Sequence, residues 1–289
     1  MKQFGFWEAD WFLGVAVVVA VVVFNLLSDL VPSLERKAYD LGVIATSRAP
    51  SDKVAVIAID EASIRSIGRW PWPRDVHAKM ADLLAQSKVK VIGSTVLLSE
   101  PQVDPGYQAI VQLQALAAKA AEAGGPAAEA LAPLTEKLKE AELALNTDRR
   151  IAESYARAGN VLVPLDFVIG RPLGKQDRPL PDYVQKYALL APAGGERPLP
   201  AFEIRYPIEP VGKAAAGLGS LTQFKDVDGA IRAEPLVVDY YGQLYPALSM
   251  MVAAKFLNLG PADIKVTPGQ SVALQRLRIS TDAELRMYT

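Results

Sequence analysis

The 289-residue sequence predicts an α/β domain, with a mixed sheet and flanking helices, joined to an N-terminal transmembrane helix and carrying an inserted helical hairpin. Three observations predict this fold class. An uncharged apolar run lies near the N-terminus, two short apolar runs flank an amphipathic segment, and a stretch rich in Ala, Leu, Glu, Lys and Gln follows them. Hydrophobic residues make up 51% of the chain and charged residues 22%, which is enough apolar material for a packed core.

The apolar run extends from Trp11 to Ser28 without a charged residue (WFLGVAVVVAVVVFNLLS). As a helix it would be about 27 Å long, close to the thickness of the hydrocarbon core of a bilayer. It is apolar on every face, and Phe6, Trp7 and Trp11 suit an interfacial aromatic belt. A cleaved signal peptide or a buried core helix explains the run less well, because it is long and no A-x-A site follows it. We therefore expect residues 1–32 to form a membrane anchor.

The charges beside this run leave its orientation open. Lys2 precedes it together with Glu8 and Asp10, and Arg36 and Lys37 follow it. The excess of Lys and Arg that marks the cytoplasmic side of a span is therefore not clear on either side.

Residues 33–289 carry the signals of the α/β domain. The apolar runs Val54–Asp60 (VAVIAID) and Val89–Leu98 (VKVIGSTVLL) are typical of strands buried on both faces. Residues 74–87 predict an amphipathic helix, with apolar residues at helical spacing: Val76, Met80, Leu83 and Leu84. A strand, a helix and a strand in this order predict a βαβ unit with parallel strands and a right-handed crossover.

The helical hairpin is expected within an insertion at about 105–147. Residues 107–145 are rich in helix formers and are broken only around Gly124-Gly125-Pro126. A further helix is expected at Asp148–Ala158, and a strand at Asn160–Leu165 follows it.

The remaining chain alternates irregular and regular segments. A proline-rich stretch at 170–210 predicts a long excursion. The last third predicts short strands with hairpin turns at 226–229 and 241–242, and a helix at Pro246–Leu257.

Composition excludes several function classes. The formal net charge of −1 offers no reason to expect binding of nucleic acid, and the chain has no cysteine. His77 is the only histidine, so catalytic triads and His-rich metal sites have little to build on. An EF-hand loop with Gly229 at position 6 would put Phe224 and Pro235 at ligand positions 1 and 12, so a β-turn is the better interpretation. We expect no catalytic residue, metal or cofactor.

The densest group of unusual residues is Ile59–Arg74 (IDEASIRSIGRWPWPR). Its acidic pair would lie at the carboxyl end of the first expected strand, where α/β sheets commonly bind ligands. Its arginines and tryptophans would form either a recognition surface or a plug at the edge of the core, and the residues alone favour the plug. The candidate residues are Asp60, Glu61, Arg69, Trp70, Trp72 and Arg74.

Two segments resemble the type-two CHASE domain, a family of extracellular sensory domains associated with cyclases and histidine kinases. The first is AIDEASIRSIGRWPWPRDVHAKMADLL, and the second is LGSLTQFKDVDGAIRAEPLVVDYYGQLYPALSMMVAAKF, in which Asp228 and Arg232 belong to the family's hairpin motif. The resemblance covers roughly residues 35–289. Two features depart from it: the insertion, and Val96, where the family often has an acidic residue.

The resemblance implies a membrane-anchored sensory domain of a bacterial receptor. The domain would lie in the periplasm or outside the cell, anchored in the inner (cytoplasmic) membrane, with a cyclase or kinase effector and further spans expected downstream. An unknown small ligand and a homodimer or other envelope proteins are the expected partners, and no enzymatic activity is expected of this chain. The alternative is an envelope scaffold that assembles through this domain and its helical insertion.

Overall fold

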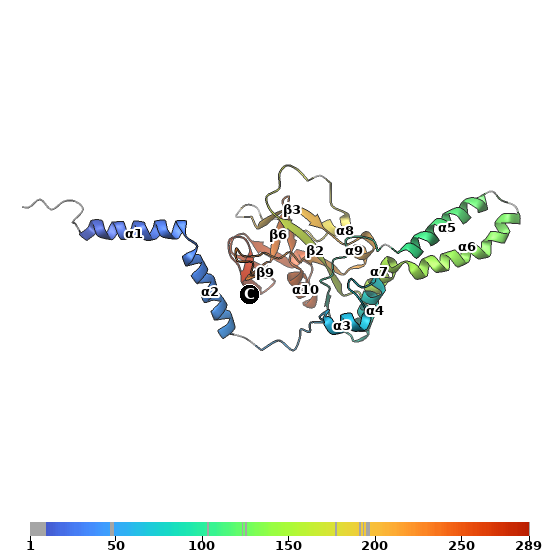
Figure 1. The fold of residues 1–289 in the computed structure, drawn as a ribbon, viewed down its shortest axis with the longest axis horizontal. Coiled ribbons are helices and arrows are strands. Elements are labelled where there is room, and N and C mark those ends of the chain that lie inside the picture. The colour runs from blue at the N-terminus through green and yellow to red at the C-terminus, as the bar shows by residue number, and fades with distance from the viewer. Residues whose placement is uncertain are drawn as a thin grey trace, which may run out of the picture. The chain divides into compact units, whose positions relative to one another are not determined.

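The computed structural model describes residues 10–46, 49–102, 104–122, 124, 126–176, 178–190, 192, 194 and 197–288. The chain divides into two units, Met1–Ser63 and Ile64–Thr289 (Figure 1). The first unit holds helices α1 (Asp10–Leu27) and α2 (Leu30–Ala45). Helix α3 (Glu61–Ile67) begins in the first unit and ends in the second, which holds the sheet.

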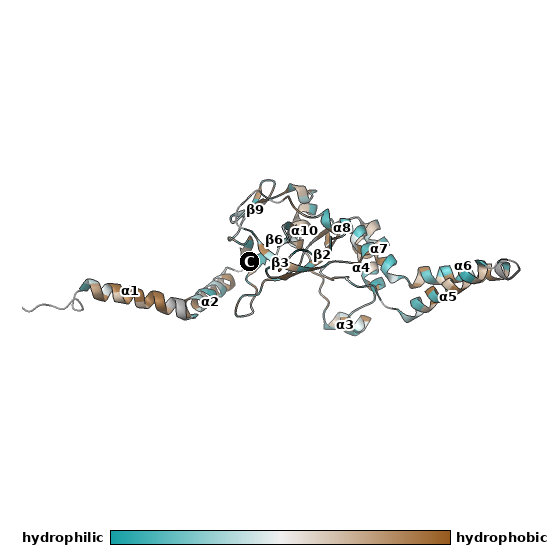
Figure 2. Cartoon of the chain, turned by 90° about the horizontal axis from the view of Figure 1, so that it is seen from above, coloured by the Kyte–Doolittle hydropathy of each residue, from teal (hydrophilic) through white to brown (hydrophobic). Residues whose placement is uncertain are grey.

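Helix α1 forms where the transmembrane helix was expected, and Figure 2 colours it as strongly hydrophobic. In the described part of the chain, no helix is long and apolar enough to cross a membrane, so the expected transmembrane helix is not found.

The prediction of a strand at 54–60, the first of the expected βαβ unit, is wrong. Residues 54–60 belong to neither a helix nor a strand, and Val54, Val56 and Ile57 are 71%, 87% and 58% exposed. Apolar, β-branched composition favours a strand, but a strand also needs a neighbour that pairs its backbone groups.

The expected helix at 74–87 is confirmed as α4 (Arg74–Gln86), but it buries a different face. Arg74, Ala78 and Ala81 are buried, whereas Met80 and Leu83 are exposed. Helix α7 (Thr147–Ala158) packs against α4, and the Ser154 hydroxyl donates to the Ala78 carbonyl at 2.9 Å. Small residues at this contact let the two helices approach closely.

A mixed sheet forms the centre of the second unit, as expected. The strands that the structure describes in it are β1 (Ile92–Gly93), β2 (Val161–Ile169), β3 (Leu199–Arg205), β4 (Gly217–Ser220), β6 (Val237–Tyr240) and β7 (Gln243–Pro246). Strand β2 pairs in parallel with β1 and β4 and antiparallel with β3. Strand β6 pairs in parallel with β3 and antiparallel with β7. Of the expected strand 89–98, only β1 is regular.

Helix α10 (Leu248–Phe256) packs against β1, β2 and β4, close to the helix expected at 246–257. At Gly219 a Cβ would lie 2.6 Å from the Leu248 Cα, so the strand and helix backbones meet where only glycine fits. The largest side chains of the core include Ile151, Leu162 and Tyr245, each fully buried.

Shorter elements complete the second unit. Helix α8 (Asp182–Gln185) and strand β3 lie in the stretch 170–210 that was expected to be irregular, and helix α9 (Glu209–Ala214) begins at its end. The C-terminal part forms a 3₁₀ turn (Pro261–Asp263) and two small sheets, made of β8 (Ile264–Thr267), β9 (Ser271–Leu274) and β10 (Leu277–Ser280), and of β5 (Ala233–Pro235) with β11 (Arg286–Tyr288).

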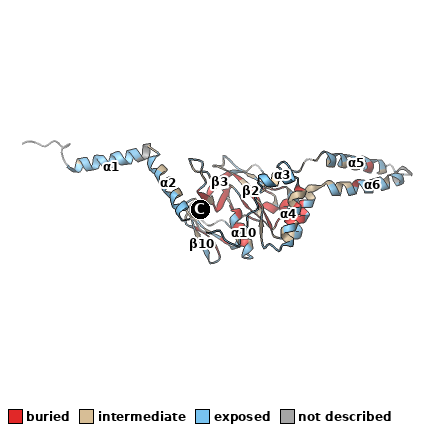
Figure 3. Cartoon of the chain, turned by 60° about the horizontal axis from the view of Figure 1, so that its bottom comes forward, coloured by how far each residue is buried: buried red, intermediate tan, exposed pale blue. Residues whose placement is uncertain are grey.

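The expected helical hairpin is confirmed as α5 (Pro105–Glu122) and α6 (Pro126–Leu145), which pack against each other. The Gln114 side-chain amide donates to the Leu138 carbonyl at 3.0 Å. At the base, Tyr107, Glu142 and Asn146 hydrogen-bond to one another. Much of the remaining hairpin surface is exposed (Figure 3).

Candidate functional site

Arg74 braces three segments of the second unit. Its side chain is 9% exposed, and its guanidinium donates to the Asp148 carboxylate and to the Glu100 carbonyl. Its backbone N–H donates to the Gln102 side-chain oxygen at 2.9 Å, and Asp148 in turn accepts from the Gln102 backbone at 3.1 Å. Burial lowers the pKa of Arg74, but an arginine stays charged in a protein. All of these partners belong to the second unit, so Arg74 connects its segments to one another.

The two tryptophans of the W-P-W-P segment form an aromatic cluster with His77. The rings of Trp70 and Trp72 lie 5.6 Å apart, and Trp70 lies 5.7 Å from the His77 ring, both edge to face. Trp72 donates its indole N–H to the Gly68 carbonyl at 2.8 Å. Burial lowers the pKa of His77, and nearby Arg74 adds to the effect. Trp70 itself is 37% exposed, so part of this cluster faces solvent, and Arg69 is exposed beside it.

Asp60 has a local structural role, and Glu61 is the first residue of α3. The Asp60 carboxylate accepts from the Ser63 N–H at 2.8 Å, and the Asp60 N–H donates to the Ser63 hydroxyl at 2.8 Å, which caps the start of α3. These hydrogen bonds to Ser63 lower the pKa of Asp60. Both acidic residues belong to the first unit, whereas the arginines and tryptophans of the motif belong to the second.

Asp228 and Arg232 form an ion-pair clamp across the hairpin turn. Arg232 Nη1 lies 2.9 Å from Asp226 Oδ2 and 2.9 Å from Asp228 Oδ1, and Nη2 lies 2.7 Å from Asp228 Oδ2. The Arg232 side chain is 9% exposed. The turn also bonds Gly229 N–H to the Asp226 carbonyl at 2.8 Å, with Gly229 at φ 83°. The sequence motif thus marks a rigid turn, and Asp226 joins the two residues expected from it.

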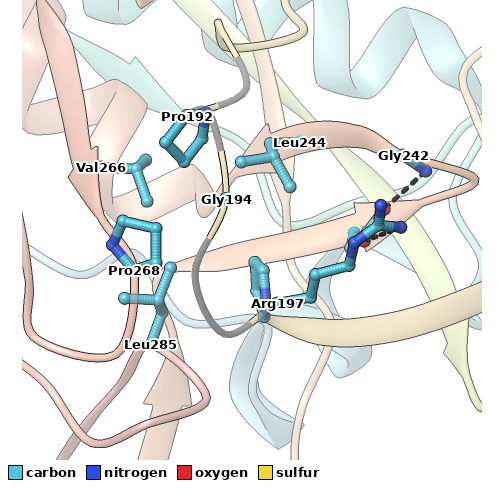
Figure 4. A pocket seen from close by; sticks show the side chains of 10 residues that line it. Pro192, Gly194, Arg197, Gly242, Leu244, Val266, Pro268 and Leu285 are labelled. Atoms are coloured by element: carbon cyan, nitrogen blue, oxygen red, sulfur yellow. Dashed lines mark hydrogen bonds and ion pairs between the residues drawn. The ribbon is translucent and has the colours of Figure 1, made fainter.

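A pocket that the sequence motifs do not mark lies beside the β6–β7 turn (Figure 4). Its volume is about 120 Å³. Arg197 and Asp239 provide its charges, and Gly194 and Gly242 complete the wall. The apolar residues that line it are Pro192, Pro198, Leu244, Val266, Pro268 and Leu285.

The two charges of this pocket are loosely paired. Arg197 Nη1 lies 3.7 Å from Asp239 Oδ2, and their side chains are 79% and 7% exposed. The other carboxylate oxygen, Asp239 Oδ1, accepts the Gly242 N–H at 2.7 Å. Only the turn signal at 241–242 was visible in the sequence, because Arg197 comes from a distant segment. Among the residues that the structure describes, no group of three or more His, Asp or Glu side chains is placed to hold a metal ion.

Comparison with known proteins gives one match. The family model described as "CHASE2 domain" matches residues 15–289. No curated protein and no solved structure matches the chain. The match covers nearly the whole chain and includes both segments that carry the resemblance in the sequence. The chain therefore belongs to the CHASE2 family, the sensory extracellular domains of signalling receptors.

Proposed function

We propose that this chain is the extracytoplasmic input domain of a bacterial signalling receptor, attached to the cytoplasmic membrane and coupled to a cyclase or kinase effector. The family match over residues 15–289 carries the proposal. An input domain works by having two states with different affinity for its ligand, so that binding shifts the balance between them.

The side of the membrane can be tested with a single cysteine, because the natural chain has none. Leu173 is 96% exposed, so Leu173→Cys leaves the core untouched. A membrane-impermeant maleimide should label this variant in spheroplasts as fully as after lysis. Labelling that requires lysis would contradict an extracytoplasmic domain. Labelling in the lysate shows that the cysteine itself can react with the maleimide.

Helix α1 is the segment that we propose for membrane attachment. Its valines are exposed over the whole helix, including Val18 at 61% and Val22 at 51%. Val18→Lys/Val22→Lys places two charges one turn apart and should move the full chain from the membrane fraction to the supernatant. Val227→Lys, at a site 80% exposed in the second unit, is the control and should stay in the membrane fraction. Equal membrane fractions for all three proteins would contradict attachment through α1.

A second function, assembly through the hairpin, is favoured by the apolar surface of α5 and α6. Leu113, Leu116 and Leu134 are 49%, 64% and 50% exposed. Helix α5 carries only two charged residues among its 18 residues, Lys119 and Glu122. Exposed leucines on a nearly uncharged helix favour packing against another apolar helical surface.

Light scattering of the purified chain tests this second function. If the hairpin pairs with a second copy, the wild type should dimerise with rising concentration and Leu116→Glu should remain monomeric. Leu173→Glu is the matched control, because the same change at a residue 96% exposed outside the hairpin should leave the dimer intact. A wild type that stays monomeric, or a dimer that survives Leu116→Glu, argues against self-assembly through this surface.

A further inference from the structure

The pocket beside the β6–β7 turn has two opposite charges next to one another (Figure 4). Asp239 is buried, with its side chain 7% exposed, and only one of its oxygens receives a hydrogen bond that the structure describes, from Gly242. A carboxylate has about four acceptor positions, so the second oxygen, Oδ2, can accept more donors. Its one described charged neighbour is Arg197, at the long distance of 3.7 Å.

Arg197 holds the complementary charge at the open side of the pocket. Its side chain is 79% exposed, and its guanidinium has five N–H donors in a planar fork that matches a carboxylate. Because Arg197 is exposed and lies 3.7 Å from Asp239, the ion pair is weak, and a ligand can separate it at little cost. The pair therefore presents an anion-binding group and a cation-binding group side by side.

The remaining wall and the size limit what can enter. Leu244, Val266 and Leu285 form an apolar surface together with three prolines. A volume of about 120 Å³ is small, since pockets that hold drug-sized ligands measure about 300–1,000 Å³. The part of a ligand that lies inside it is therefore small, such as a short aliphatic chain.

We propose that this pocket binds a small α-amino acid, such as alanine, serine or glycine, in its zwitterionic form. The ligand carboxylate pairs with the Arg197 guanidinium, the ammonium group pairs with Asp239 Oδ2, and the side chain lies against Leu244 and Leu285. The role of this ligand as the input signal of a sensory domain rests on the proposed function.

Calorimetric titration of the full chain tests the proposal with L-alanine and two analogues that each keep one charge, propionate and ethylamine. L-Alanine should bind at least about tenfold more tightly than either analogue, because only the zwitterion satisfies both groups. L-Phenylalanine should bind more weakly than L-alanine, because its ring is too large to lie inside the pocket. Absence of L-alanine binding at millimolar concentration, or propionate binding as tight as L-alanine binding, would overturn the proposal.

Three variants place the binding in this pocket. Arg197→Gln and Asp239→Asn should each weaken L-alanine binding at least about tenfold. Asparagine keeps an oxygen that can accept the Gly242 N–H, and circular dichroism checks that the fold is retained. Arg276→Gln, at an exposed arginine outside the pocket, should bind as the wild type does. Unchanged binding in Arg197→Gln would overturn the assignment.

The proposed function can fail independently of this ligand. The Leu173→Cys labelling reports the side of the membrane whether or not an amino acid binds. Periplasmic labelling without amino-acid binding would leave the sensory domain in place and remove the pocket proposal alone.

Discussion

Replacing Asp148 by alanine should destabilise the second unit by about 3 kcal/mol. The replacement leaves Arg74, whose side chain is 9% exposed, without its carboxylate partner. Removing one member of a buried ion pair typically costs about 3–5 kcal/mol, because the other charge stays buried. The lower end applies here, since Asp148 is 19% exposed and Arg74 keeps its bond to the Glu100 carbonyl. In a unit of this size, the loss corresponds to a decrease in Tm of roughly 6–12 °C.

Urea unfolding followed by tryptophan fluorescence measures this change, because Trp70 and Trp72 lie close to α4. The double variant Arg74→Met/Asp148→Leu should be more stable than Asp148→Ala, since it removes both charges. Arg157→Gln is the control: its ion pair with Asp82 also joins α7 to α4 but is 60% and 37% exposed, so its loss should cost less than about 1 kcal/mol. An Asp148→Ala variant no less stable than Arg157→Gln would refute the bracing role.

Three further outcomes are expected. Gly219→Ala should cost about 1–3 kcal/mol in urea unfolding, because its Cβ would lie 2.6 Å from the Leu248 Cα, and a wild-type midpoint would contradict the close approach. Burial lowers the pKa of His77 below its ordinary 6.5, so the unfolded chain protonates first. The free energy of unfolding should therefore be highest above pH about 6.5 and decrease as the pH falls through the lower folded pKa. His77→Phe should lose this part of the pH dependence, and an identical pH profile would count against it. Arg232→Lys keeps the charge but not the paired hydrogen bonds to Asp228, so the free energy of unfolding should decrease by about 1–2 kcal/mol. Thermal unfolding measures this change, and an unchanged Tm would contradict the clamp.

The mixed sheet, the hairpin and three of the flanking helices could be predicted from local patterns. Helix α7 begins one residue before its expected start, and β2 begins one residue after the expected start of its strand and extends four residues beyond the expected end. These elements have strong local signals: Asn146 caps α7 with a hydrogen bond to Arg149 N–H at 3.0 Å, and Gly159 ends it at φ 65°.

Two predictions were wrong because they depend on neighbouring elements that the sequence does not show: the buried face of α4 and the strand at 54–60. The largest apolar residues of α4 suggested the buried face, but α7 packs against Ala78 and Ala81 instead, since small residues permit the closer contact. Residues 54–60 have the composition of a strand, yet pairing decides whether a strand forms.

The candidate sites divide in the same way. The turn at 226–229 was expected from the sequence, but the ion pairs of Arg232 with Asp226 and Asp228 were not. The pocket could not be predicted, because Arg197 and Asp239 are separated by β3, α9, β4 and β5 along the chain and meet only through the pairing of β3 with β6.

The hairpin has a consequence for how this domain can change in evolution or by design. Its helices leave and rejoin the fold between β1 and β2, which are adjacent strands. At the base, Asn146 donates to Tyr107 at 3.1 Å and to Glu142 at 2.9 Å, so the two helices are fastened where they begin and end. The hairpin can therefore change in length independently of the sheet. Adding whole helical turns beyond Tyr107 and Glu142 should cost little more free energy than the entropy of closing a longer loop. A reporter or a rigid handle for imaging could occupy the same place without disturbing the sheet.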